Sequence, residues 1–284
     1  MRVFSTLIST DALAGLLERE AAVVVDVRHD LADPAAGERA YAEGHLPGAH
    51  FLHLDRDLSG PKTGCNGRHP LPEAGTLAAA LGAIGADADT QVVVYDQAAG
   101  MFAARAWWLL RWLGHDAVAV LDGGFAKWVR EGRATSVERP VPGPRCFAGG
   151  PPAATASAAE ILANLGRAGL TVVDARAPER YRGDVEPLDP VAGHIPGAIN
   201  RPYTENLLSD GTLKPAAQLR REYLALLADR DVATVVHQCG SGVTACHNVL
   251  AMQIAGLAGS RLYPGSWSEW CSDPSRPVAR GPSP

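Results

Sequence analysis

The part of this sequence best suited to chemistry is a cysteine followed by two nearby glycines. Cys239 opens the run Cys-Gly-Ser-Gly-Val-Thr-Ala. The apolar, β-branched residues 233–236 before it predict a buried parallel strand, and residues 249–254 after it have the spacing of a helix packed on a sheet. We therefore predict that Cys239 lies at a strand-to-helix turn.

The two glycines on either side of Ser241 let the backbone turn so that successive N–H groups converge, and the positive end of the following helix adds to them. Such a site binds an anion, and a thiolate is an anion. Cys239 is thus a candidate nucleophile at neutral pH, although most free cysteines are simply small buried residues. The residues expected to hold the anion are Gly240, Gly242, Val243, Thr244 and Ala245.

The composition limits the class of protein. The chain has 284 residues, 46% hydrophobic and 20% charged, with a net charge of -5, which allows two globular domains and offers no basic surface for nucleic acid or anionic lipid. No apolar run approaches the length of a membrane span and no signal peptide is evident, so we expect a cytoplasmic protein. The five cysteines include no Cys-x-x-Cys pair, which argues against a disulfide framework or a zinc site.

Four blocks occur twice in the same order and indicate a duplicated domain. They include Gly-His-Leu-Pro-Gly-Ala at 44–49 with Gly-His-Ile-Pro-Gly-Ala at 193–198, and residues 92–96 with 234–238. The predicted fold is α/β, with two tandem domains that each form an open, mainly parallel sheet flanked by helices. We expect the domains at 1–138 and 154–284, joined by a Pro- and Gly-rich linker at 139–153.

The cysteine run resembles the active-site loop of the mercaptopyruvate sulfurtransferases, and the whole chain resembles a tandem-domain rhodanese superfamily sulfurtransferase. The duplication and the ending Asp273-Pro-Ser-Arg-Pro-Val support this resemblance. It implies that the Cys239 thiolate takes sulfur from a small anionic donor and forms a persulfide. A thiol, thioredoxin or cyanide would then remove that sulfur, and no cofactor or metal is required.

The resemblance also implies roles for single residues. Arg180 falls where the family binds the anionic end of the donor, a task that suits a guanidinium, although a solvated surface arginine is the alternative. Ser241 matches a member of a serine, histidine and aspartate relay, and its partners here would be His69 and Asp55. His69 would move a proton and Asp55 would fix its tautomer, whereas a loop histidine beside a proline is otherwise merely exposed.

Two donors remain open. The mercaptopyruvate members carry a second arginine near a Glu-Pro pair, whereas Glu186-Pro187 is followed here by Leu188 and Asp189. Thiosulfate members carry Arg and Lys directly after the cysteine, where this chain has Gly240 and Ser241. The loop favours 3-mercaptopyruvate, with thiosulfate as the alternative.

Other classes fit less well. A dual-specificity phosphatase needs an arginine six residues after the cysteine, and this chain has Ala245 there. A non-enzymatic binding module would suit the first half, which reads Asp96-Gln-Ala-Ala-Gly at the matching place. Because His45 and His194 recur in both halves, we expect them to have a structural role, with the side chain bonded to the backbone at the turn.

Overall fold

The computed structural model describes residues 3–141, 143–167 and 169–283 and divides the chain into two units. Unit 1 comprises Met1–Gly60, Pro72–Ala153 and Ser209–Leu213, and unit 2 comprises Pro61–Leu71, Ala154–Leu208 and Lys214–Pro284. A single division at the predicted linker 139–153 would therefore separate two segments, 61–71 and 209–213, from the units to which they belong. That linker includes Pro142, and the predicted domains include residues 1, 2, 168 and 284, all of which lie outside the described residues.

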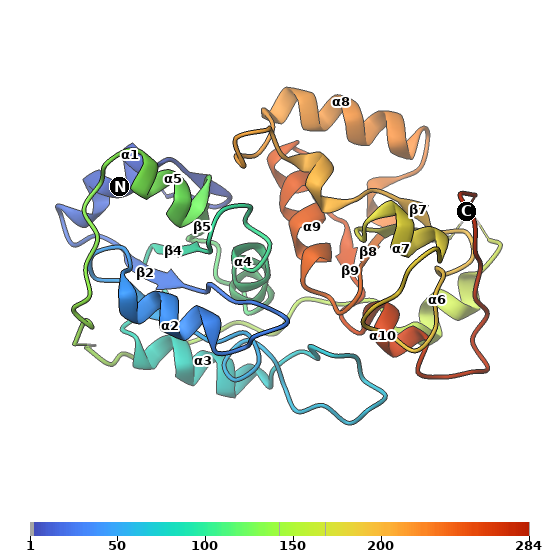
Figure 1. The fold of residues 1–284 in the computed structure, drawn as a ribbon, viewed down its shortest axis with the longest axis horizontal. Helices are drawn as coiled ribbons and strands as arrows, with labels where there is room; N and C mark the ends of the chain where they lie inside the picture. Colours follow the sequence, from blue (N-terminus) through green and yellow to red (C-terminus); the bar gives the residue numbers. More distant parts are fainter. Residues whose placement is uncertain (1–2, 142, 168, 284) are drawn as a thin grey trace. The chain divides into compact units, whose positions relative to one another are not determined.

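Unit 1 contains a parallel sheet of five strands in the order β1-β5-β4-β2-β3. The strands are β1 (Leu7–Ile8), β2 (Val23–Asp26), β3 (His50–Phe51), β4 (Val92–Tyr95) and β5 (Val118–Leu121). The helices are α1 (Thr10–Leu17), α2 (Ala36–Glu43), α3 (Ala74–Ala83), α4 (Ala103–Trp112) and α5 (Gly124–Arg130). Figure 1 shows α1 and α5 on one side of this sheet and α2 and α3 on the other.

Alternation along the strands explains the layering of unit 1, because successive side chains of a strand point to opposite faces. Val24 and Val93 pack in one cluster with Leu13 of α1 and Trp128 of α5. Ser9 caps α1 with its side chain, which accepts a hydrogen bond from Ala12 N, as expected for a helix N-terminus.

Unit 2 contains a parallel sheet of four strands in the order β7-β6-β8-β9. The strands are β6 (Thr171–Asp174), β7 (Ile199–Asn200), β8 (Val235–Gln238) and β9 (Arg261–Leu262). The α-helices are α6 (Ala158–Asn164), α7 (Pro178–Arg182), α8 (Ala216–Leu227), α9 (Thr244–Ile254) and α10 (Ser266–Trp270), and two short 3-10 helices are η1 (Tyr203–Asn206) and η2 (Val232–Thr234).

Two apolar clusters cover the two faces of the second sheet. Val172 and Val236 pack with residues of α6, α7 and α10, whereas their neighbours Val173 and Val235 pack with residues of α8 and α9. Figure 1 shows α8 and α9 together on one side of this unit. Both units are therefore three-layered α/β structures, as the sequence predicts.

The strand registers correct one detail of the predicted repeat. Asp26 lies opposite Tyr95 in the first sheet, and Asp174 lies opposite Gln238 in the second. Asp96 is therefore equivalent to Cys239, and the match of 92–96 with 234–238 is wrong by one residue. The cause is η2, which takes up Thr234 before the strand begins, because the Asp231 side chain accepts a hydrogen bond from Ala233 N.

Among the described residues, none of the helices has the length and apolar character needed to cross a bilayer.

Candidate functional site

Cys239 follows the last residue of β8, and α9 begins five residues later. The predicted strand-to-helix turn is confirmed. Its side chain is buried, with 2% of the residue exposed, and Gly242 N donates a hydrogen bond to its Sγ across 3.2 Å. An N–H group that donates to the sulfur can stabilise negative charge that develops on it during a reaction.

The main chain of Cys239 is held by the residues around the start of α10. Its N–H donates to Ser266 Oγ at 3.1 Å, and its C=O accepts from Trp267 N at 2.9 Å. Ser266 itself has a positive φ of 53° and is fully buried. These bonds fix the direction in which the thiol leaves the sheet, so the nucleophile is positioned before any substrate binds.

The turn itself requires glycine at position 242. Gly242 has a φ of +78°, and a Cβ added there would lie 2.3 Å from Pro264 O. The turn therefore rests against the loop before α10, and it carries the chain into the N-terminus of α9, whose positive end adds to the anion site. Cys246 in α9 is packed rather than reactive, since its Sγ donates to Gly242 O at 3.3 Å and the residue is fully buried.

Ser241 and His69 are brought together within unit 2. His69 Nδ1 lies 2.8 Å from Ser241 Oγ, and both residues are buried. The segment that carries His69 is held there by its main chain, because Arg68 N donates to Ser268 Oγ at 3.0 Å. A hydroxyl paired with an imidazole can move a proton near a reacting group at neutral pH.

Two guanidinium groups lie against the glycine that follows the nucleophile. A Cβ built on Gly240 would lie 2.8 Å from Arg68 Nη2 and 3.3 Å from Arg180 Nη1. Arg180 belongs to α7 and Arg68 to the segment 61–71. Two guanidinium groups beside the residue that follows the cysteine could bind a small anion. Sequence analysis named Arg180 as a candidate and did not name Arg68, whose one available signal was its position next to His69.

Carboxylates hold these arginines in place. Arg180 Nη2 donates to Glu186 Oε1 at 2.6 Å, and Arg68 pairs with Asp189. Arg176, which is 1% exposed, donates to Asp174 Oδ2 at 2.7 Å. This last pair ties the Arg176 side chain to the end of β6.

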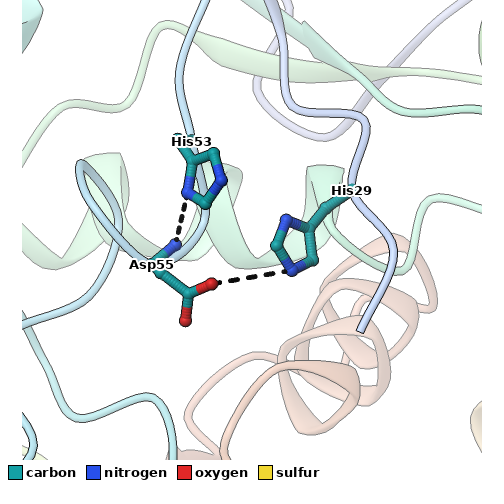
Figure 2. A group of neighbouring side chains, drawn as sticks. All are labelled: His29, His53 and Asp55. Carbon is teal, nitrogen blue, oxygen red and sulfur yellow. Dashed lines mark hydrogen bonds and ion pairs between the residues drawn. The ribbon is translucent and has the colours of Figure 1, made fainter. Parts of the chain in front are cut away.

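Asp55, the third predicted member of the relay, belongs to unit 1. There its Oδ2 lies 3.8 Å from His29 Nε2, and its N–H donates to His53 Nδ1 at 3.1 Å. Figure 2 shows the three side chains facing one another. Their donor atoms all lie within 4.8 Å of one another, a set that could hold a metal ion. However, His53 Nε2 also bonds Pro34 O at 3.0 Å, so both of its ring nitrogens contact the main chain and the cluster fits a role in fixing the Asp55 loop better than a metal site.

The loop of unit 1 that matches the cysteine run shows what its amides do with an anion. The Asp96 carboxylate accepts hydrogen bonds from the N–H groups of Ala98, Gly100, Phe102 and Ala103, at 2.8 to 3.2 Å. Burial raises the pKa of this carboxyl, and the four donors act in the opposite direction. An acceptor side chain at the position equivalent to Cys239 is thus surrounded by main-chain donors, the arrangement that the sequence predicts for the thiolate.

The two repeated histidines have the structural role predicted for them. His45 Nδ1 bonds Tyr41 O and His194 Nδ1 bonds Tyr181 O, both at 2.8 Å. Each ring also stacks on the tyrosine whose carbonyl it bonds.

A buried thiol at a strand-to-helix turn, with an N–H group that donates to it and two guanidinium groups beside the next residue, could transfer a group from a small anion. The family model "Rhodanese-like domain" matches residues 9–131 and 157–273. The chain is 51% identical over 278 residues to a Pseudomonas aeruginosa protein named "Probable 3-mercaptopyruvate sulfurtransferase", covering 97% of this chain and 98% of the relative. It is 35% identical over 265 residues to the thiosulfate sulfurtransferase of Mus musculus, covering 86% and 84%.

A solved structure, the 3-mercaptopyruvate sulfurtransferase from Leishmania major, superposes with a TM-score of 0.82 at 30% identity and covers 94% of this chain and 74% of the other. The chain belongs to the rhodanese family, with two tandem rhodanese domains. It is a sulfurtransferase.

Proposed function

We propose that this sulfurtransferase moves one sulfur atom from 3-mercaptopyruvate to a thiol or cyanide acceptor through a persulfide on Cys239. The observation that carries the proposal is the placement of Arg68 and Arg180 beside Gly240, directly after the nucleophile. Their guanidinium groups would hold the carboxylate of the donor while its sulfur reaches Cys239.

In the first step the Cys239 thiolate attacks the donor's thiol sulfur. The carbon–sulfur bond breaks, its electron pair stays on carbon as the enolate of pyruvate, and the sulfur remains on Cys239 as a persulfide. The enolate needs one proton to become pyruvate. Ser241 would deliver it, recharged by His69 through the 2.8 Å contact.

In the second step a thiolate or cyanide attacks the outer sulfur of the persulfide. The sulfur–sulfur bond breaks, the outer sulfur leaves on the acceptor, and Cys239 returns as the thiolate. Gly242 N, which already donates to Sγ, and the amides up to Ala245 would stabilise the negative charge in both states. The small thiol, thioredoxin and cyanide are all acceptors of suitable chemistry.

Thiosulfate is the second candidate donor. Leu188 stands beside the Glu-Pro pair where mercaptopyruvate members carry an arginine, and its side chain is exposed. The mouse relative named above is a thiosulfate sulfurtransferase. The same persulfide would form, with sulfite as the leaving group.

Mass spectrometry tests the proposal directly. After mixing with 3-mercaptopyruvate or thiosulfate, the peptide that contains Cys239 should gain about 32 Da, the mass of one sulfur atom. Cys239→Ser should gain nothing, and Cys65→Ser, which removes an exposed cysteine, should gain the same mass as the unmodified protein. No gain of mass with either donor would contradict the proposal that Cys239 carries the transferred sulfur. The ratio of kcat/KM for the two donors then decides between them.

We also propose that the protein works in the cytoplasm. All five cysteines are free thiols in the structure, which suits a reducing compartment. Cell fractionation with an antibody to the protein tests this location.

A further inference from the structure

One carboxylate lies between the two arginines of the donor site. Asp189 accepts from Arg68 through Oδ1 and lies 3.4 Å from Arg180 Nη2 through Oδ2. Its side chain is 3% exposed, whereas those of Arg68 and Arg180 are 27% and 18% exposed. The negative charge is therefore buried behind two partly accessible positive charges.

Apart from the Cys239 thiolate, the charged side chains around the donor site balance in number. Their contacts connect three arginines with three carboxylates: Arg68, Arg176 and Arg180 with Asp174, Glu186 and Asp189. Arg176 contacts Asp174 and Glu186 and is almost completely buried. Its role is therefore to hold the loop together and not to bind a donor. The site thus attracts an anion through Arg68 and Arg180 while Asp189 repels the same anion from behind them.

This repulsion depends on the charge of the donor. Coulomb energy scales with the product of the charges, so Asp189 acts about twice as strongly on a dianion as on a monoanion at the same distance. Mercaptopyruvate carries one carboxylate and a neutral thiol, whereas thiosulfate carries two negative charges. Burial raises the pKa of Asp189 and its pairing with Arg68 acts against that shift, which is consistent with a charge that is costly to keep unless the arginines face it.

We propose that Asp189 sets the donor specificity of the enzyme by favouring singly charged donors over doubly charged ones, as a shared counter-ion of Arg68 and Arg180. The inference rests on the proposed function, since it names how the same site chooses its substrate. Asp189 is a positioning and specificity residue, and it does not touch the reacting sulfur.

The test compares Asp189→Asn with two matched variants at constant ionic strength. In Asp189→Asn, the ratio of kcat/KM for thiosulfate to kcat/KM for mercaptopyruvate should rise about tenfold or more, which is the effect of about 1.4 kcal/mol. Asp189→Glu keeps the charge and should stay within about twofold of the unmodified ratio. Asp184→Asn removes a nearby exposed carboxylate that pairs with Arg182, and it should leave the ratio unchanged.

Several outcomes would overturn the inference. The ratio could stay constant or fall in Asp189→Asn, Asp189→Glu could show the same shift as Asp189→Asn, or Asp184→Asn could shift it equally. A constant or falling ratio in Asp189→Asn would mean that Asp189 does not select donors by charge. The same shift in Asp189→Glu would assign the effect to packing, and an equal shift in Asp184→Asn would assign it to general surface charge. If Asp189→Asn fails to fold, as judged by circular dichroism, Asp189→Ser carries the same expectation.

A binding measurement separates this inference from the proposed function. Sulfate is a dianion and pyruvate a monoanion, and neither can donate sulfur. By calorimetry, Asp189→Asn should bind sulfate about tenfold more tightly than the unmodified protein does and pyruvate by a smaller factor; equal changes for both anions would refute the inference. If the unmodified protein forms no persulfide, the proposed function fails regardless of this result.

Discussion

Arg180 and its neighbour Arg182 lie on the same short helix and have different surroundings. Arg180 faces Gly240 beside the nucleophile, whereas Arg182 pairs with Asp184 at the surface. Arg180→Ala should raise the KM for the sulfur donor by about tenfold or more, because a hydrogen bond to a charged group contributes about 1.5 to 3 kcal/mol. Steady-state kinetics with both donors measures this.

Arg182→Ala is the control and should keep the KM of the unmodified protein. An unchanged KM in Arg180→Ala would remove that residue from the donor site and leave Arg68 as the group that binds the anion.

His69 should matter for one donor more than for the other. The enolate that leaves mercaptopyruvate needs a proton, whereas sulfite does not. His69→Ala should therefore lower kcat for mercaptopyruvate more than kcat for thiosulfate. The loss for mercaptopyruvate should be about 10²- to 10⁴-fold, the range typical of a general acid or base. Single-turnover measurements of pyruvate and sulfite release test this. Equal slowing of both donors would indicate that the contact with Ser241 is structural.

The residue pattern was sufficient to name Cys239 as a candidate nucleophile, whereas Ser241 and His69 were named through the resemblance to the mercaptopyruvate sulfurtransferases. The sequence could not show that Arg68 lies beside Gly240, because Arg68 belongs to a segment of the first half that folds with unit 2. Nor could it show that Asp189 lies between two arginines, since that depends on how the 183–193 loop folds back over α7.

The turn between β8 and α9, which holds Cys239, depends on glycine at position 242. Gly242→Ala should lower the melting temperature and reduce persulfide formation, because a side chain there has both an unfavourable φ and a backbone oxygen at 2.3 Å. Gly197→Ala is the matched control: Gly197 has a φ of +83° with no atom within 4 Å of an added Cβ. It should show only the cost of the positive φ, about 1 kcal/mol.

Differential scanning calorimetry and the mass assay measure both variants. Equal losses in the two would mean that the contact with Pro264 does not constrain the turn.

Helix α8 is attached to the rest of unit 2 by an acid with several donors. Glu222 accepts from Arg201, Gln218 and Lys214 at 2.6 to 2.9 Å. Desolvation alone would raise the pKa of Glu222, but these three partners hold it at about 2, below its ordinary value of 4.5. A carboxyl with a lowered pKa in the folded state stabilises the fold above its unfolded pKa, and this contribution disappears as the pH falls through the folded value.

Glu222→Gln should therefore lower the free energy of unfolding at pH 7 by about 1 to 3 kcal/mol, and the difference should shrink between about pH 4.5 and pH 2. Urea unfolding at several pH values measures it. Glu205→Gln, which removes a half-exposed partner of the same Arg201, should have a smaller effect. A difference that stays constant with pH would show that the ionised carboxylate is not the stabilising species.

Strand and helix patterns predicted the order of elements well and their ends less well. Residues 233–236 were expected as a strand, but the strand is Val235–Gln238 because η2 takes up the first two of these residues. Helix α9 begins at Thr244, five residues before the expected Val249. Its first turns contain the buried polar residues His247 and Asn248, which do not show the apolar spacing by which a helix is recognised.

At the scale of the whole molecule, both halves repeat one scaffold. Arg28 and Arg176 each bind the aspartate two residues before them and donate to a glycine carbonyl, Gly44 O at 2.7 Å and Gly193 O at 2.8 Å. Each repeated histidine also pairs with the end of its own half, His45 with Ser136 and His194 with Ala279. The duplication could therefore be recognised from short repeated motifs, because the residues of those motifs make the same hydrogen bonds and ion pairs in each domain.

A substitution in the first half should change the stability of the protein without preventing sulfur uptake at Cys239 in the second half. Asp96→Asn should lower the free energy of unfolding by about 1 to 3 kcal/mol, because an amide nitrogen would face main-chain donors that now contact a carboxylate. The folded fraction should still gain one sulfur atom at Cys239. Denaturant unfolding and the mass assay measure the two effects, and Asp116→Asn, at an exposed carboxylate, is the control.

Loss of sulfur uptake in folded Asp96→Asn would mean that unit 1 contributes to the chemistry through this loop. An unchanged free energy of unfolding would mean that the four hydrogen bonds to Asp96 add nothing to stability.

Segment 61–71 lies in the first half of the chain and folds with unit 2. A fragment that starts at residue 154 would thus keep Cys239, Ser241 and Arg180 but would lack Arg68 and His69. Expressing the second half alone would leave one of the two arginines beside Gly240 and would leave Ser241 without its histidine partner. Supplying residues 61–71 as a separate peptide, or splicing them onto the fragment, should restore part of the lost turnover. A shortened form of the enzyme would therefore have to include residues 61–71.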